Sequence, residues 1–242
     1  MQAIQTLGLT KRYKNLTAVD HLDLEISEGE LFALLGVNGA GKTTIIKMLT
    51  CLTKPTEGDA LVGGSSITKH PEQIKGKIGV SPQETAVAPN LSVKENLELI
   101  CGIHGFSREK TAGKIRELTE QFALDTVLQR KAGKLSGGWQ RRVSIAMALI
   151  SEPKILFLDE PSLGLDVLAR HDLWDVIRSL KGRSTIILTT HYMEEAEALS
   201  DRIGILKNGR LLAVGTAEAL KAKAGASEFE EAFVTIVKEA YV

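Results

Sequence analysis

A glycine-rich segment directly after a short apolar run constrains this chain more than any other feature. The segment reads Gly-Val-Asn-Gly-Ala-Gly-Lys-Thr-Thr at positions 36–44 and follows the apolar residues 31–35. An apolar run ending in the pattern G-x-x-x-x-G-K-[ST] predicts a buried strand, a tight turn and a helix. Backbone N–H groups of such a turn, together with the positive end of the helix, can cradle phosphate groups. Lys42 is then expected to reach the β and γ phosphates, and Thr43 to ligate Mg²⁺.

Two glycines of this loop are expected to need a backbone conformation that a side chain would block. They are Gly39 and Gly41, which precede the predicted helix. The complete predicted phosphate loop consists of Gly36, Val37, Asn38, Gly39, Ala40, Gly41, Lys42, Thr43 and Thr44.

Two adjacent carboxylates follow a second apolar run. Residues 155–158 are Ile-Leu-Phe-Leu, and Asp159 and Glu160 come next. A buried strand with acids at its C-terminal end suits a metal site beside a phosphate loop. We expect Asp159 to hold Mg²⁺ and Glu160 to polarise an attacking water. Adjacent acids repel each other unless a cation or a proton separates them.

His191 follows a third apolar run, at 185–189. It is therefore also expected at the C-terminal end of a strand, where an imidazole can hydrogen-bond a γ-phosphate oxygen.

A second glycine-rich helix start lies at Leu135-Ser136-Gly137-Gly138. Ser136 and the two glycine amides can bind a phosphate at the positive end of a helix. The same residues can equally form a plain helix N-cap with flexible glycines. Both interpretations stay open from these residues alone.

Charge and cysteine content restrict the class of protein. Thirty basic and thirty acidic side chains cancel, so no global charge favours nucleic acid or an anionic membrane surface. The pair Arg141-Arg142 is expected on a solvated face or at a phosphate. Two cysteines outside any C-x-x-C pattern are typical of a reduced, cytosolic protein.

Apolar stretches stay far below the roughly 18 residues of a membrane helix, which predicts a soluble chain or one held at a membrane by other subunits.

The order of apolar runs predicts an α/β fold. Residues 4–26 alternate as an antiparallel sheet would, and later strands alternate with helices, which implies a mainly parallel sheet. Ser92 and Glu95 form a capping-box pattern that opens a helical region. Lys207-Asn208-Gly209-Arg210 predicts a hairpin turn, and two short helices are expected after Ala217.

With these motifs in order, the chain resembles the ATP-binding subunits of ATP-binding-cassette (ABC) transporters from Ile4 to about Gly215. Residues 36–43 resemble the family's Walker A motif and 155–160 its Walker B motif. Further matches, also in family order, are the adenine-stacking aromatic at Tyr13, the Mg²⁺-contacting glutamine at Gln83, the LSGGQ signature at Leu135, Ser136, Gly137, Gly138 and Trp139, the D-loop ending at Asp166, and the switch histidine at His191.

The resemblance implies a P-loop NTPase core with a mainly parallel sheet, an N-terminal antiparallel β subdomain and an inserted α-helical subdomain. It implies a nucleotide-binding domain at 1–216, with the helical subdomain at about 84–150, and a short helical extension at 217–242. Catalytic roles are implied for Glu160, His191, Gln83 and Lys42, and Mg²⁺ ligation for Thr43, Gln83 and Asp159.

The assembly is also implied by the resemblance. Two copies would pair head to tail as a homodimer, with each ATP between the Walker A motif of one copy and the signature of the other. The dimer would lie on the inner face of the cell membrane, against separately encoded permease subunits that contact residues 84–105. No nucleic-acid partner is expected.

Residues 189–197 and the ending Phe-Glu-Glu-Ala-Phe at 229–233 resemble the exporter branch, whose cargoes are drugs, lipids, polysaccharides or sodium ions. Three alternatives remain: an importer ATPase, a soluble cassette ATPase acting on ribosomes or DNA, and a nucleotide sensor that does not hydrolyse ATP.

The sequence departs from the family pattern at Trp139, where glutamine is usual. Ser136 and the glycine amides would still make the phosphate contacts, so ATP use is expected to survive. The indole is expected to pack within the helical subdomain rather than on the partner's nucleotide.

Overall fold

The structure is a computed structural model that describes residues 1–239. At its centre lies a sheet with strand order β10-β9-β3-β8-β7-β6. Within the described residues, β9 and β10 form the antiparallel pair of this sheet and the other neighbours run parallel. The expected α/β fold class is therefore confirmed. The strands are β3 (Leu31–Gly36), β6 (Ile78–Ser81), β7 (Ile155–Asp159), β8 (Thr185–Thr190), β9 (Arg202–Lys207) and β10 (Arg210–Gly215).

A second, antiparallel sheet forms from the N-terminal part of the chain, as the alternating pattern predicted. Its described strands have the order β2-β1-β4-β5. Leu22, Leu24 and Ile26 are buried while Asp23 and Glu25 between them are exposed, so one face packs inward. The strands are β1 (Gln2–Tyr13), β2 (Leu16–Ser27), β4 (Glu57–Val62) and β5 (Ser65–Ser66).

Strand β3 separates two hydrophobic cores, because successive side chains of a strand point to opposite faces. Phe32 and Leu34 join a core shared with α1 and the antiparallel sheet. Leu31, Ala33 and Leu35 join a larger core built with helices α3 to α9. Apolar residues at every position of β3 are thus explained by burial on both faces.

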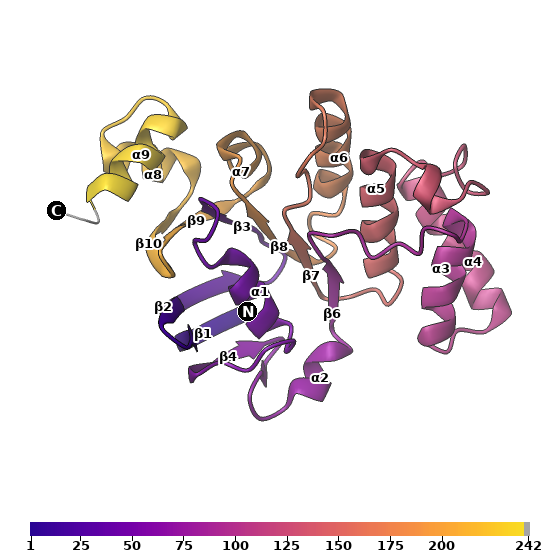
Figure 1. The fold of residues 1–242 in the computed structure, drawn as a ribbon, viewed down its shortest axis with the longest axis horizontal. Coiled ribbons are helices and arrows are strands. Elements are labelled where there is room, and N and C mark those ends of the chain that lie inside the picture. The colour runs from indigo at the N-terminus through magenta and orange to yellow at the C-terminus, as the bar shows by residue number, and fades with distance from the viewer. Residues whose placement is uncertain (240–242) are drawn as a thin grey trace.

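Helices surround this sheet, as Figure 1 shows. Helices α3 and α4 lie at one end of the molecule beyond α5, whereas α8 and α9 lie at the opposite end. The helices are α1 (Lys42–Leu49), α2 (Pro71–Lys75), α3 (Val93–Ile103), α4 (Arg108–Gln121), α5 (Gly137–Ala148), α6 (Val167–Ser179), α7 (Met193–Leu199), α8 (Ala217–Ala224) and α9 (Phe229–Glu239), with a 3₁₀ turn at Ala132–Lys134.

The expected helical segment 84–150 contains α3, α4 and α5; its independence as a subdomain stays a prediction. The expected extension 217–242 contains α8 and α9, and its residues 240–242 lie outside the described range. Across residues 1–239, every helix is too short or too polar to cross a membrane.

The structure confirms two local predictions, the capping box at Ser92 and the hairpin turn at residues 207–210. Ser92 caps α3, and its side chain and that of Glu95 bond each other's backbone N–H groups in a capping box. Asn208 and Gly209 both have positive φ (49° and 78°) in the hairpin between β9 and β10. The sequence analysis missed the short elements β5 and α2, which follow β4.

Candidate functional site

The glycine-rich loop joins β3 to α1 in a conformation that requires glycine. Gly39 and Gly41 have φ angles of 82° and 105°, a region that L side chains rarely adopt. A Cβ atom at Gly41 would lie 2.4 Å from the carbonyl oxygen of Ala18. The loop is therefore held against β2, and the N-terminus of α1 follows it directly.

Lys42 is folded into this loop rather than extended into solvent. Its side chain is 6% exposed, and its Nζ donates to the carbonyl oxygen of Gly36 at 2.5 Å. The same Nζ lies 3.1 Å from Glu160 Oε1. A cation thus sits beside the acidic pair, as the repulsion between adjacent acids requires.

Asp159 and Glu160 lie at the end of β7, next to the loop. Asp159 Oδ1 accepts a hydrogen bond from Thr43 Oγ1 at 3.2 Å and one from Thr189 Oγ1 at 2.5 Å. Glu160 Oε2 lies 2.8 Å from His191 Nδ1. Glu160 therefore connects Lys42 on one side with His191 on the other, and both carboxylates are almost fully buried.

Glu160 has an unusual backbone conformation for a residue with a side chain. Its φ is 48°, in the left-handed region. Its N–H is held by the neighbouring strand β8, where it donates to Thr189 O at 3.1 Å and to Thr189 Oγ1 at 3.0 Å. These bonds turn the carboxylate back toward the phosphate loop.

A cleft of about 600 Å³ opens above this cluster. It brings together eleven of the expected site residues: Tyr13, Asn38, Gly39, Ala40, Gly41, Lys42, Thr43, Thr44, Gln83, Glu160 and His191. Tyr13 is 44% exposed at the cleft, and Lys11 Nζ lies 5.1 Å from the centre of its ring. Of the other expected residues, Gly36 and Asp159 are buried beneath the loop, and Val37 is exposed on it.

The expected signature residues and Asp166 do not line this cleft, although Leu163 of the expected D-loop does. Ser136 is the N-cap of α5, yet its side chain makes no capping hydrogen bond, and the residue is exposed. Gly137 and Gly138 begin the helix, and Leu135 is buried just before it. Asp166 has a local structural task, because its carboxylate caps α6 by accepting from Ala169 N at 2.9 Å.

Trp139, the departure from the family pattern, packs within its own chain, and its role toward a partner's nucleotide stays a prediction. It is half-buried against the larger core. The guanidinium of Arg142 lies over its ring, 4.9 Å from the centre.

The expectation for Arg141 was wrong. This residue is 4% exposed, so it lies neither on a solvated face nor free for a phosphate. Its guanidinium donates to the carbonyl oxygens of Pro82 and Gln83. Sequence reasoning also missed Thr189, although its place at the end of the strand before His191 was an available signal.

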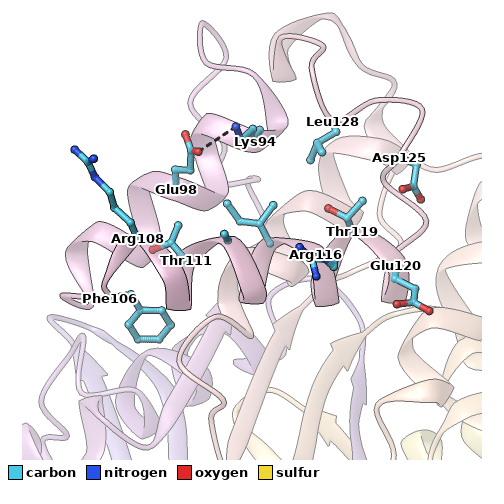
Figure 2. A pocket seen from close by; sticks show the side chains of 12 residues that line it. Lys94, Glu98, Phe106, Arg108, Thr111, Arg116, Thr119, Glu120, Asp125 and Leu128 are labelled. Atoms are coloured by element: carbon cyan, nitrogen blue, oxygen red, sulfur yellow. Dashed lines mark ion pairs between the residues drawn. The ribbon is translucent and has the colours of Figure 1, made fainter.

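A larger groove, of about 890 Å³, lies away from this chemistry between α3 and α4 (Figure 2). Its walls carry the ion pair of Lys94 with Glu98, the ring of Phe106 and alternating charges from α4. It holds none of the clustered carboxylates, histidine or loop amides described above. The cleft at the glycine-rich loop is therefore the candidate active site.

Comparison with known proteins agrees with this geometry. The sequence model of the family described as ABC transporter matches residues 19–163, more than half of the chain. The chain belongs to the ABC transporter family. The daunorubicin resistance ATP-binding protein DrrA3 of Streptomyces coeruleorubidus is 39% identical to this ABC protein over 229 residues, which are 94% of this chain and 72% of the relative.

Solved structures extend the likeness to the whole fold of this ABC protein. The ATP-binding subunit of an ABC transporter has a TM-score of 0.85 at 29% identity, over 97% of this chain and 99% of its own. An ATP-binding cassette solved as a dimer in a post-hydrolysis state with ADP and Pi has a TM-score of 0.79, also at 29% identity, over 88% of this chain and 98% of its own. This ABC protein is accordingly an ATP-binding and ATP-hydrolysing subunit.

Proposed function

We propose that this ABC ATPase works as a homodimer that hydrolyses Mg²⁺-bound ATP in its phosphate-loop cleft and powers export through separately encoded membrane subunits. The observation that carries the proposal is the contact of Glu160 with both Lys42 and His191 at the mouth of the loop. A cleft that only bound nucleotide would not need a buried carboxylate turned toward the phosphates by a strained backbone.

The residues beside the loop fit Mg²⁺. Thr43 Oγ1 and Asp159 Oδ1 are oxygen donors 3.2 Å apart, and Gln83 lines the same cleft. Mg²⁺ is commonly held by one or two carboxylates together with phosphate and water oxygens, so a larger acidic cluster is not required. When bound, the ion would neutralise charge on the β and γ phosphates.

The protein's own residues supply the remaining steps of hydrolysis. Loop amides and Lys42 bind the β and γ phosphates, which compete with Glu160 for the lysine ammonium. Glu160 then accepts a hydrogen bond from the attacking water and orients it in line with the leaving ADP oxygen. His191 holds the second oxygen of Glu160 and is placed to stabilise charge on the γ phosphate. Tyr13 is placed to stack on the adenine.

A second copy of the chain would complete each site. Ser136 is exposed with a side chain that does not cap its own helix, and it lies outside the cleft that holds Lys42. Its hydroxyl and the Gly137 and Gly138 amides would bind the γ phosphate held by the other copy. The similar cassette solved as a dimer supports this arrangement.

Export is the proposed direction, because the relative with which this chain aligns over 94% of its length is named for daunorubicin resistance. A drug is therefore the cargo class with most support; lipid, polysaccharide and sodium-ion export rest on residues 189–197 and 229–233 alone and stay predictions. Leu99 and Ile103 on α3 are 48% and 71% exposed, which suits contact of residues 84–105 with permease subunits at the inner membrane face.

The test is the Glu160→Gln substitution. We expect it to preserve ATP binding but to lower kcat by about 10²–10⁴-fold, because the amide cannot polarise water. With ATP it should elute as a stable dimer in size-exclusion chromatography. Glu194→Gln, a matched change at an exposed carboxylate near His191, should leave turnover and elution unchanged. Wild-type turnover by Glu160→Gln would overturn the proposed mechanism.

A further inference from the structure

Arg141 stands out because a fully charged side chain is buried on α5 and bonded only to main-chain oxygens. It lies four residues after Gly137, the first residue of the helix. Its Nη1 donates to Pro82 O at 2.6 Å and its Nη2 to Gln83 O at 2.5 Å. The planar fork of the guanidinium thus holds two consecutive carbonyl groups at the end of β6.

Burial of the Arg141 guanidinium is unfavourable for folding, because a charged group loses its hydration there. None of the ion pairs found among residues 1–239 includes Arg141, and burial lowers its pKa, while the carboxylates of Asp159 and Glu195 raise it. A buried cation without a directly bonded anion loses its hydration, and only well-placed hydrogen bonds offset that loss. A leucine or methionine would fill the space without that cost.

Arg141 belongs to a continuous seam between α5 and β6. One turn later, Ser144 Oγ lies 3.0 Å from Ser81 Oγ, and both are buried. One further turn on, Ala148 O lies so close to Gly79 that a Cβ atom there would be 2.3 Å away. Positions 141, 144 and 148 share one face of a helix, so α5 and the strand leading to Gln83 are attached along their length.

We infer that Arg141 is a positioning residue that ties the backbone at Gln83 to the helix carrying the signature motif. Ser136 and Gly137 at the start of α5 and Gln83 at the cleft then move as one unit. A shift of the signature against a second copy's ATP would carry Gln83 with it, and with Gln83 the contact to the metal. This inference rests on the proposed roles of Gln83 and of the signature.

The first test is hydrogen–deuterium exchange of the purified full chain without nucleotide. Arg141→Gln should speed exchange of the Ala88 amide by at least about tenfold, because two charge-assisted bonds that hold this segment are lost. Among the described residues, Ala88 is the first after Gln83 whose N–H is protected by a hydrogen bond, to Asn96 Oδ1 at 2.7 Å. Arg141→Lys keeps the charge but cannot hold two carbonyls with one fork, so it should give a smaller increase at the same amide. Unchanged exchange at Ala88 in both variants would overturn the inference.

A matched control separates tethering of Gln83 from general stabilisation. Arg202 also holds a carbonyl, that of Glu25, and pairs with Glu30, but it lies on β9 away from the cleft. Arg202→Gln should lower the melting temperature and leave exchange at Ala88 unchanged. Equal acceleration at Ala88 in this control would show a structural effect only and overturn the inference.

The second test is a double-mutant cycle read by calorimetric Mg²⁺ binding with a non-hydrolysable ATP analogue. Gln83→Ala and Arg141→Gln should each weaken Mg²⁺ binding, and the double variant should be no weaker than Gln83→Ala alone. If the double variant instead lost Mg²⁺ affinity by the sum of the two single losses, Arg141 would not act through Gln83, and the inference would be overturned. No loss in Gln83→Ala would instead overturn the metal role of Gln83, and the inference with it.

Discussion

At the scale of single residues, burial changes the pKa of Glu195, which lies close in sequence to His191. It is fully buried on α7, four residues after His191, and its Oε1 accepts from Trp174 Nε1 at 3.0 Å. Its Oε2 and the buried hydroxyl of Ser162 make no hydrogen bond of standard distance and angle among the described residues. Burial raises the pKa of Glu195, while the Thr190, Ser162 and Trp174 side chains act in the opposite direction.

We predict that Glu195→Gln changes the pH dependence of stability. A raised pKa means that the folded state keeps a proton that the unfolded state loses, so the contribution of Glu195 is favourable below the unfolded pKa of about 4.3 and is lost as pH rises toward the folded pKa. The amide keeps the bond to Trp174 and carries no charge. Urea unfolding should therefore find the variant more stable than the wild type at pH 8, with the difference shrinking toward pH 5; a constant difference would contradict this.

At the residue level, the backbone geometry of the glycine-rich loop could be predicted because its signal is local in sequence. The phosphate loop could be predicted because Gly39, Gly41, Lys42 and Thr43 follow one another at fixed spacing. Arg141 could not, because its partners at Pro82 and Gln83 are almost 60 positions away and no pattern in the sequence relates them.

At the scale of elements, close packing of α5 on β6 sets the position of Gln83. Alternation and apolar runs predicted the long strands, because burial on one face or on both leaves a clear pattern. The two-residue strand β5 and the five-residue helix α2 are too short to show any period. Their formation depends on pairing with β4 and on contacts with neighbouring strands.

Gly79→Ala tests the packing of these two elements. The added Cβ would lie 2.3 Å from Ala148 O and 2.9 Å from Pro153 Cγ, so α5 must move away from β6. We expect a loss of about 1–3 kcal/mol in the free energy of unfolding, as for overpacked cores. Gly76→Ala is the control, because its Cβ would meet nothing within 4 Å and its φ is −77°. Urea unfolding that ranks both variants equally would contradict the packing argument.

At the scale of the whole molecule, the phosphate-loop cleft and the predicted signature lie at separate places in the chain. Lys42 and Glu160 lie in the cleft at the end of the parallel strands, whereas Ser136 begins a helix outside it. Sequence motifs predict both half-sites, whereas the distance between them depends on the packing of α5 against the sheet. A homodimer in which each copy supplies the other's missing half is the simplest arrangement that uses both.

Mixing two inactive variants tests this arrangement directly. Lys42→Ala removes the loop lysine, and Ser136→Arg blocks the signature, so each variant alone should lack ATPase activity. If sites form between copies, a mixed dimer contains one site with Lys42 from one chain and Ser136 from the other, and one site that lacks both. A 1:1 mixture gives half mixed dimers, so about a quarter of wild-type activity should return if the sites act independently. If one chain supplied every ligand, both sites of a mixed dimer would stay defective, and the mixture would be as inactive as its components.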